Sequence, residues 1–211
     1  MVTRETILQA AAEIIDEHGY AAATLSKILD RARVTKGALY YHFRSKDQIA
    51  ESLLAIQVPM SRVKPQLSKF QEAIDTSYIY ANLLQNRPVA RAAIRLSIDG
   101  GVPPELDVQG ATRAWIALAT HLMTEADRGG QLLLHWTPQD AAEVIQSSFV
   151  GAQLTSMQLT GPLRTDLPQR ISRMWRSLLP SLTAPGLILG LDYKEDRWSR
   201  IPWDTDKSPT E

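Results

Sequence analysis

The chain has 211 residues, of which 44% are hydrophobic and 22% charged, which is ordinary for a globular protein long enough to bury a core. Its 23 basic and 23 acidic side chains give a formal net charge of zero, so a charged partner must be met by a local patch. The absence of cysteine excludes disulfides and thiolate chemistry and fits a reducing compartment. The N-terminal segment carries acids within its apolar pattern, unlike a signal peptide, and we find no apolar run of about 18 residues that would span a membrane. We therefore expect a cytoplasmic protein.

Helical spacing begins at the N-terminus, where Ile7, Ala11, Ile14 and Ile15 recur on one face and Gly19 ends the helix. Three cap signals follow, and each opens a short predicted helix. Thr24 caps residues 25–32, Thr35 caps the segment that begins VTKG, and Ser45-Lys46-Asp47-Gln48 has the form of a capping box.

The rest of the chain also reads as helices, separated by breaks near Pro59, at residues 86–88 and at residues 100–104. The predicted segments are 73–85, 88–98, 111–128, 138–159 and 167–179. Nothing alternates with period two over the length of a strand, so the predicted fold class is all-α. Residues 193–211 are polar, contain Pro202 and Pro209, and are expected to form a loose tail.

Two short helices joined by a tight turn predict a helix-turn-helix, and basic residues gather on it. Between Thr24 and Lys46 six basic side chains stand against the single acid Asp30, a local net charge of +5; they are Lys27, Arg31, Arg33, Lys36, Arg44 and Lys46. Such a patch favours phosphate binding, and Gly37, without a Cβ, lets the helix approach a duplex closely. A charge run is more often a solvated face, and on spacing alone both interpretations stay open.

The stretch TLSKILDRARVTKGALYYHFRSKDQIAESLL closely resembles the DNA-binding signature of the TetR family of repressors. The resemblance implies a three-helix helix-turn-helix domain over residues 1–46 that binds double-stranded DNA. It is followed by a helical ligand-binding and dimerisation domain over residues 47–192, and then by the polar tail of residues 193–211. Arg33 departs from the pattern, which commonly has Gly at the turn, and a positive φ there would strain the backbone.

The same resemblance assigns roles within the signature. Lys36 is implied to reach into the major groove, while other side chains contact the DNA backbone and fix the register. The implied DNA-binding set is Thr24, Arg33, Thr35, Lys36, Gly37, Tyr40, Tyr41 and Lys46. His42 and Phe43 are expected to pack against the first helix instead.

A second resemblance covers most of the chain more diffusely. VARAAIRLSID, Trp115 and VGAQLTSMQ are similar to the γ-butyrolactone autoregulator receptors of Streptomyces. This subfamily implies release from DNA by a small lactone, butenolide or furan-type effector, control of secondary metabolism, and Gln57, Trp115 and Thr155 as ligand contacts. Read as residues alone, a buried Trp is more often core, and a helical Thr more often bonds its own backbone. An antibiotic or another apolar molecule as effector is the alternative.

The sequence shows no enzyme motif, and its four histidines have no metal-ligand spacing, so we expect neither catalysis nor a cofactor. A helical ligand-binding protein that never touches DNA is the rival interpretation. Apolar residues on segments 138–159 and 167–179 exceed what one buried face needs, which predicts a homodimer through these two helices. A dimer would also suit a palindromic operator, because its two equivalent helix-turn-helix units can bind the two half-sites.

Overall fold

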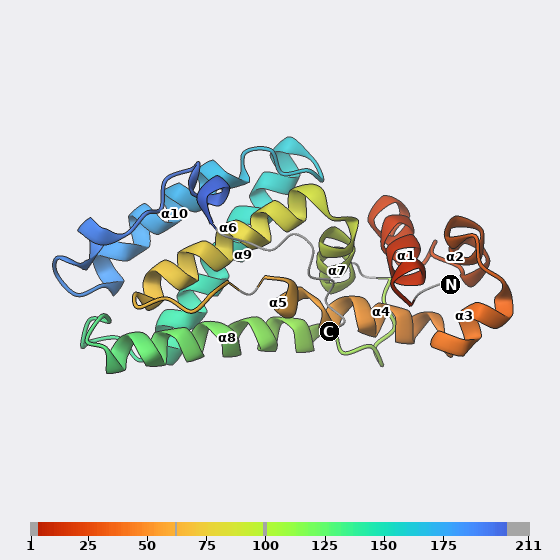
Figure 1. The fold of residues 1–211 in the computed structure, drawn as a ribbon, viewed down its shortest axis with the longest axis horizontal. Coiled ribbons are helices and arrows are strands. Elements are labelled where there is room, and N and C mark those ends of the chain that lie inside the picture. Colours follow the sequence, from red (N-terminus) through yellow and green to blue (C-terminus); the bar gives the residue numbers. More distant parts are fainter. Residues whose placement is uncertain (1–3, 62, 99–100, 202–211) are drawn as a thin grey trace. The chain divides into compact units, whose positions relative to one another are not determined.

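A computed structural model describes residues 4–61, 63–98 and 101–201, and within them the fold is all-α as predicted (Figure 1). The α-helices are α1 (Arg4–His18), α2 (Leu25–Ala32), α3 (Lys36–His42), α4 (Lys46–Ala55), α5 (Gln57–Met60), α6 (Lys69–Asn86), α7 (Pro88–Ile98), α8 (Val108–Arg128), α9 (Pro138–Thr160) and α10 (Leu167–Leu182). Two 3-10 helices follow, η1 (Leu187–Gly190) and η2 (Arg197–Arg200). No helix in the described part of the chain is long and apolar enough to cross a membrane.

The predicted helix starts are confirmed by their hydrogen bonds. The hydroxyl of Thr24 accepts from the backbone N–H of the third residue after it at 3.3 Å, and that of Thr35 does the same at 3.2 Å. Ser45 accepts from the N–H of Gln48 at 3.2 Å, and the Gln48 side chain accepts in return from the N–H of Arg44 at 2.7 Å. These bonds satisfy N–H groups that the first turn of a helix leaves without a partner, so local sequence fixes where the helices begin.

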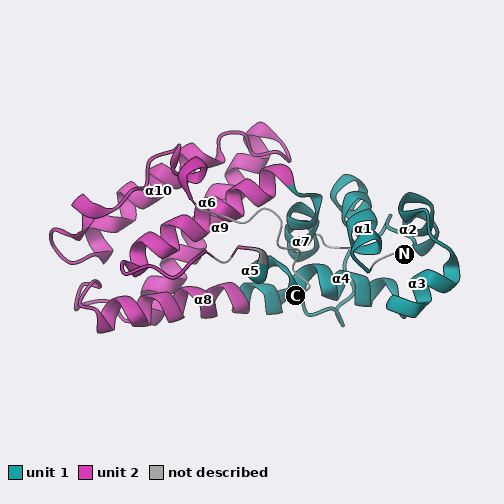
Figure 2. Cartoon of the chain, in the orientation of Figure 1, with its two compact units in different colours: residues 1–59, 87–112 teal, residues 60–86, 113–211 magenta. Residues whose placement is uncertain are grey.

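The chain divides into two compact units, each of which combines segments distant in sequence (Figure 2). Unit 1 holds residues 1–59 and 87–112, and unit 2 holds residues 60–86 and 113–211. In unit 1 helices α1, α4 and α7 pack on one core, built largely from aliphatic side chains of these helices together with Phe43. This division by packing differs from the functional boundary that we predict at residues 46 and 47, which stays a prediction.

In unit 2, α10 packs against both α6 and α9, and the largest fully buried side chain, Trp175, donates its indole N–H to Ser77 Oγ at 3.0 Å. The apolar residues of α9 and α10, which the sequence analysis counted as more than one buried face needs, mostly pack into this core. Ala141, Ala142, Ile145, Phe149, Trp175 and Leu179 are buried within the single chain, and Ala152, Leu154, Met174 and Leu178 are half-buried. The apolar surface left for a partner is therefore smaller than the sequence suggested.

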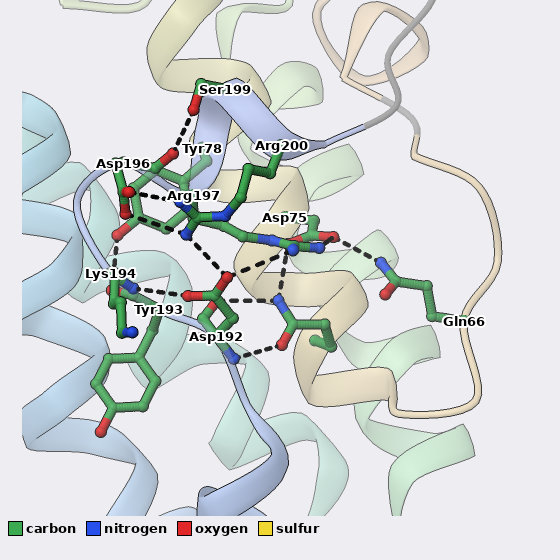
Figure 3. A network of polar contacts seen from close by, with 11 residues as sticks. Gln66, Asp75, Tyr78, Asp192, Tyr193, Lys194, Asp196, Arg197, Ser199 and Arg200 are labelled. Atoms are coloured by element: carbon green, nitrogen blue, oxygen red, sulfur yellow. Dashed lines mark hydrogen bonds and ion pairs between the residues drawn. The ribbon is translucent and has the colours of Figure 1, made fainter.

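The segment that follows α10 differs from the loose tail expected from its composition, at least through Ile201. Arg197 donates to both carboxylate oxygens of Asp75 on α6, at 2.8 and 2.7 Å, and Asp75 is only 1% exposed (Figure 3). The same carboxylate accepts from Gln66 and Gln71, each at 2.8 Å. A buried charge is stable only with such partners, so residues 193–201 belong to the folded unit. The rest of the predicted tail, residues 202–211, lies outside the described residues.

Candidate DNA-binding surface and ligand site

The turn between α2 and α3 is made by a residue that strains it. Arg33 has φ 55° and ψ 45°, the left-handed conformation that glycine adopts freely, and its N–H closes the end of α2 on the carbonyls of Leu29 and Asp30. The conformation anticipated from the departure at Arg33 is thus present. Its side chain is exposed. Glycine would adopt this conformation with less strain than arginine. Strained residues of this kind occur often at functional sites, so the charge of Arg33 is a candidate for a functional role.

Helix α3 presents most of its surface to solvent. Leu39 is fully buried and anchors the helix, while Lys36 and Gly37 are exposed and the rings of Tyr40 and Tyr41 are 46% and 86% exposed. A Cβ built on Gly37 meets no protein atom within 4 Å. The fold of the single chain therefore does not require glycine there, and the position is open to an approach from outside the chain.

Two exposed cations of the basic patch already have partners within the chain. Arg31 forms ion pairs with Glu13 at 3.0 Å and Glu17 at 3.1 Å on α1, which draw its charge away from the α3 surface. Lys27 donates to the carbonyl of Ala22 at 3.1 Å. The charge available to a phosphate backbone is therefore smaller than the local count of +5.

Lys46, at the start of α4, is held by Tyr20. Its ammonium lies 3.8 Å from the centroid of the Tyr20 ring and donates to the Tyr20 carbonyl at 3.1 Å. Partial burial lowers the pKa of Lys46, an effect that the neighbouring carboxylate of Asp47 opposes. The Tyr20 hydroxyl donates to Asp47, and burial, followed by this bond, raises the pKa of that hydroxyl. Tyr20, which the sequence analysis did not single out, thus fixes the direction of the Lys46 side chain.

The other predicted residues on this surface have defined places. Thr24 and Thr35 are exposed caps, so each hydroxyl is already committed to its helix. Phe43 is buried in the core of unit 1, as expected. His42 is half-buried and lies edge-on to Tyr41, with ring centroids 5.0 Å apart.

The three predicted ligand contacts have different environments. Trp115 on α8 is half-buried, and its ring centroid lies 4.7 Å from that of Tyr80 on α6. Tyr80 also packs on Phe149 of α9, with 5.9 Å between ring centroids. Gln57, in unit 1, is buried at the start of α5 and donates to Leu54 O at 3.5 Å. Thr155 is exposed and donates to Gly151 O at 2.8 Å, the usual bond of a helical threonine.

Within unit 2 the structure therefore joins Trp115 to an aromatic group with Tyr80 and Phe149, and it leaves the Thr155 side chain on the surface of the single chain. Tyr80 and Phe149 were not singled out in the sequence. No local signal marks them, because their meeting depends on how three helices pack. A half-buried Trp against a buried Tyr offers a flat apolar wall of the kind that small-molecule sites use.

An exposed, basic second helix following a tight turn, on a three-helix core, defines the protein as a helix-turn-helix DNA-binding protein. Residues 7–53 match the model of the bacterial regulatory proteins of the tetR family. The chain is 37% identical to TylP, a TetR regulator from Streptomyces fradiae, over 94% of both chains, with a TM-score of 0.87. The chain belongs to the TetR family of transcriptional regulators.

Two further relatives indicate the branch of the family. The A-factor receptor protein of Streptomyces griseus is 36% identical over 88% of this chain, and the match spans 66% of that receptor's length. A γ-butyrolactone receptor described as ArpA-like is 28% identical in its crystal structure, covers 93% of this chain and 96% of its own, and has a TM-score of 0.69. The relatives are regulators and receptors rather than enzymes, and the chain resembles the γ-butyrolactone receptors within the family.

Proposed function

We propose that the protein is a repressor that binds a palindromic operator as a homodimer and leaves it when a small γ-butyrolactone, butenolide or furan-type molecule binds, and that it controls secondary metabolism. The observation that carries the DNA-binding part is the α3 surface, where an open glycine stands between an exposed lysine and two exposed tyrosines. The similarity to the A-factor receptor and the ArpA-like receptor supports the class of effector.

On the DNA, we propose that α3 enters the major groove with Lys36 reading a base edge and Gly37 allowing the close approach. Thr35, Tyr40, Tyr41 and the strained Arg33 supply contacts to the DNA backbone. Thr24 and Lys46 flank them at the starts of α2 and α4. Phosphate contacts position a protein and base contacts specify the sequence, so variants of the two kinds should differ in salt dependence and in specificity.

We propose that two copies associate through α9 and α10. The exposed side of α9 has small side chains one turn apart at Ser147 and Gly151, over which a partner helix can approach closely, and Leu159 is 69% exposed further along the helix. A Cβ on Gly151 meets no atom of its own chain within 4 Å. Gly151→Arg should therefore leave the monomer folded and shift sedimentation from dimer to monomer. An unchanged dimer would refute this interface.

For the effector, we propose that Trp115 forms the apolar wall, and that Gln57 and Thr155 supply hydrogen bonds. A ligand releases DNA only if it binds the DNA-incompetent conformation better than the competent one. Gln57 lies two positions after the last residue of α4, the helix that begins four positions after the last residue of α3, so a shift of Gln57 would pass along α4 within unit 1.

The experiment is a titration of candidate effectors into preformed complexes of the protein with its operator. Trp115→Ala should raise the concentration needed for release most, whereas Gln57→Ala and Thr155→Val should each raise it about 2- to 12-fold, as expected for a lost hydrogen bond of ~0.5–1.5 kcal/mol. Trp198→Ala, which removes an indole that is 46% exposed, is the matched control and should respond as wild type. Release by an unrelated apolar compound, but by no lactone, butenolide or furan, would favour the alternative effector class.

A further inference from the structure

Two exposed charges on α9 and α10 differ from most charged side chains around them. Arg176 on α10 makes no hydrogen bond or ion pair with any described residue of its own chain. Glu143 on α9 is also exposed, and among the described residues it accepts only from Gln139, at 2.7 Å. In the same unit Arg170 and Arg197 are each paired with an aspartate at 2.7 Å. Such neutralisation within the chain is missing at Glu143 and Arg176.

Both charges stand on the outward sides of their helices. On α9, Glu143 lies one turn before the exposed Ser147, on the side where the small side chains leave room for a partner helix. On α10, Arg176 lies away from Ile171 and Trp175, which are fully buried. The two charges are therefore available to a molecule that approaches α9 and α10 from outside.

The two helices lie side by side and run antiparallel (Figure 1). Near the loop that joins them, the Ser156 hydroxyl on α9 donates to the carboxylate of Asp166, just before α10. At the other end the backbone N–H of Leu133, ahead of α9, donates to the carbonyl of Leu182 at 2.9 Å. Both exposed charges fall between these two links, at a similar height along the helix pair, although they do not bond each other within the chain.

A two-fold axis between two copies would give each of these charges a partner. In an interface with this symmetry every contact occurs twice, because the same patch is used by both copies. When α9 of one copy crosses α10 of the other at this height, Glu143 meets Arg176 of the partner subunit, and the reciprocal pair forms on the other side of the axis.

We infer that Glu143 and the partner's Arg176 form ion pairs, two in each dimer, which select a second copy of this chain as the partner. This rests on the proposed function, from which it takes dimerisation through α9 and α10. Much of the apolar side-chain surface of these helices is already buried within the chain. Complementary charges therefore fix the register of the two copies, and like charges exclude partners that present the wrong sign.

A role as ordinary solvated charges makes a different prediction. Exposed charges contribute little to stability, so if both side chains only face water, reversing either charge leaves self-association unchanged. Two such variants, when mixed, would then form the three possible dimers in statistical proportions. The two roles are therefore separated by the choice of partner.

The test reverses each charge separately and then mixes the two full-length variants. Glu143→Arg creates two contacts between like charges in its own dimer, and so does Arg176→Glu, so the dissociation constant of each homodimer should rise about 100-fold or more. In the mixture each contact again joins opposite charges, and the heterodimer should form in preference to both homodimers. Sedimentation gives the dissociation constants, and native mass spectrometry of variants with tags of different mass counts the three dimers.

Glu105→Arg, the same reversal at an exposed glutamate of unit 1, is the matched control and should dimerise like wild type. Raising the salt concentration should weaken the preference for the heterodimer, because salt screens exposed charges. Thermal unfolding checks that each variant is folded, and Glu143→Lys with Arg176→Asp replaces any reversal that is not.

Wild-type self-association of both single variants, or a statistical mixture of the three dimers, would overturn the inference. If the wild-type chain is dimeric in those cases, the proposed dimer through α9 and α10 survives and only the charge pairing is lost. A wild-type chain that sediments as a monomer would overturn both the pairing and the proposed homodimer.

Discussion

Replacing Gly37 separates the needs of the fold from the needs of DNA binding. The residue is exposed at the second position of α3, and an added Cβ meets no protein atom within 4 Å. Because glycine is about 1 kcal/mol less favourable than alanine within a helix, Gly37→Ala should leave the free energy of unfolding unchanged or raise it by up to that amount. Valine has a lower helix propensity than alanine but a higher one than glycine, so Gly37→Val should not destabilise the protein either.

On DNA the same methyl groups stand where the duplex is proposed to approach. Holding α3 off the groove weakens base contacts worth about 1–3 kcal/mol each, so Gly37→Val should lose roughly 10-fold or more in specific affinity, and Gly37→Ala less. Fluorescence anisotropy with operator DNA, beside thermal unfolding, measures both effects. Gly190→Ala, at another glycine with open surroundings, is the control and should change neither. Wild-type DNA affinity in a folded Gly37→Val variant would refute the close approach of α3.

Three further predictions concern single side chains. Arg33→Gly should relieve strain and stabilise the protein by roughly 1 kcal/mol, while lowering the salt dependence of DNA binding by about one counterion; lower stability would refute the strain. Lys36→Ala should weaken specific binding by about 1–3 kcal/mol, whereas Lys46→Ala should weaken specific and non-specific binding alike; identical behaviour of the two would refute their assigned roles. Arg197→Ala should lower the unfolding free energy by ~3 kcal/mol in denaturant titrations, because it leaves Asp75 charged and buried, and Asp75→Asn should restore part of the loss; no loss would show that the segment is dispensable.

The helices and their starts were predictable because their signals are local. Thr24, Thr35 and Ser45 cap the helices that they were expected to cap, and Gly19 ends α1 with φ 81°. The left-handed turn at Arg33 also follows from local geometry, since the turn needs a positive φ whichever residue occupies it. Such features depend on a few neighbouring residues and survive without knowledge of the tertiary fold.

Contacts between distant segments could not be read in this way. The polar composition of residues 193–201 predicted a loose tail, but Arg197 finds a buried carboxylate 122 positions earlier in the chain. Similarly, the pairing of Arg31 with α1 removes charge that a count along the sequence assigns to the DNA-binding surface. Arg164, between α9 and α10, is only 2% exposed, and nothing in the neighbouring sequence signals that this arginine is buried.

The central claim is sequence-specific DNA binding through α3 that a small molecule reverses. The most direct test is selection of binding sites from a random duplex library with the purified protein, followed by addition of candidate effectors to the selected complex. We expect enrichment of a palindrome with half-sites spaced for two copies of α3, loss of that enrichment with Lys36→Ala, and release by a γ-butyrolactone, butenolide or furan-type compound. Recovery of unrelated sequences, or the same enrichment with Lys36→Ala and Gly37→Val, would contradict the account.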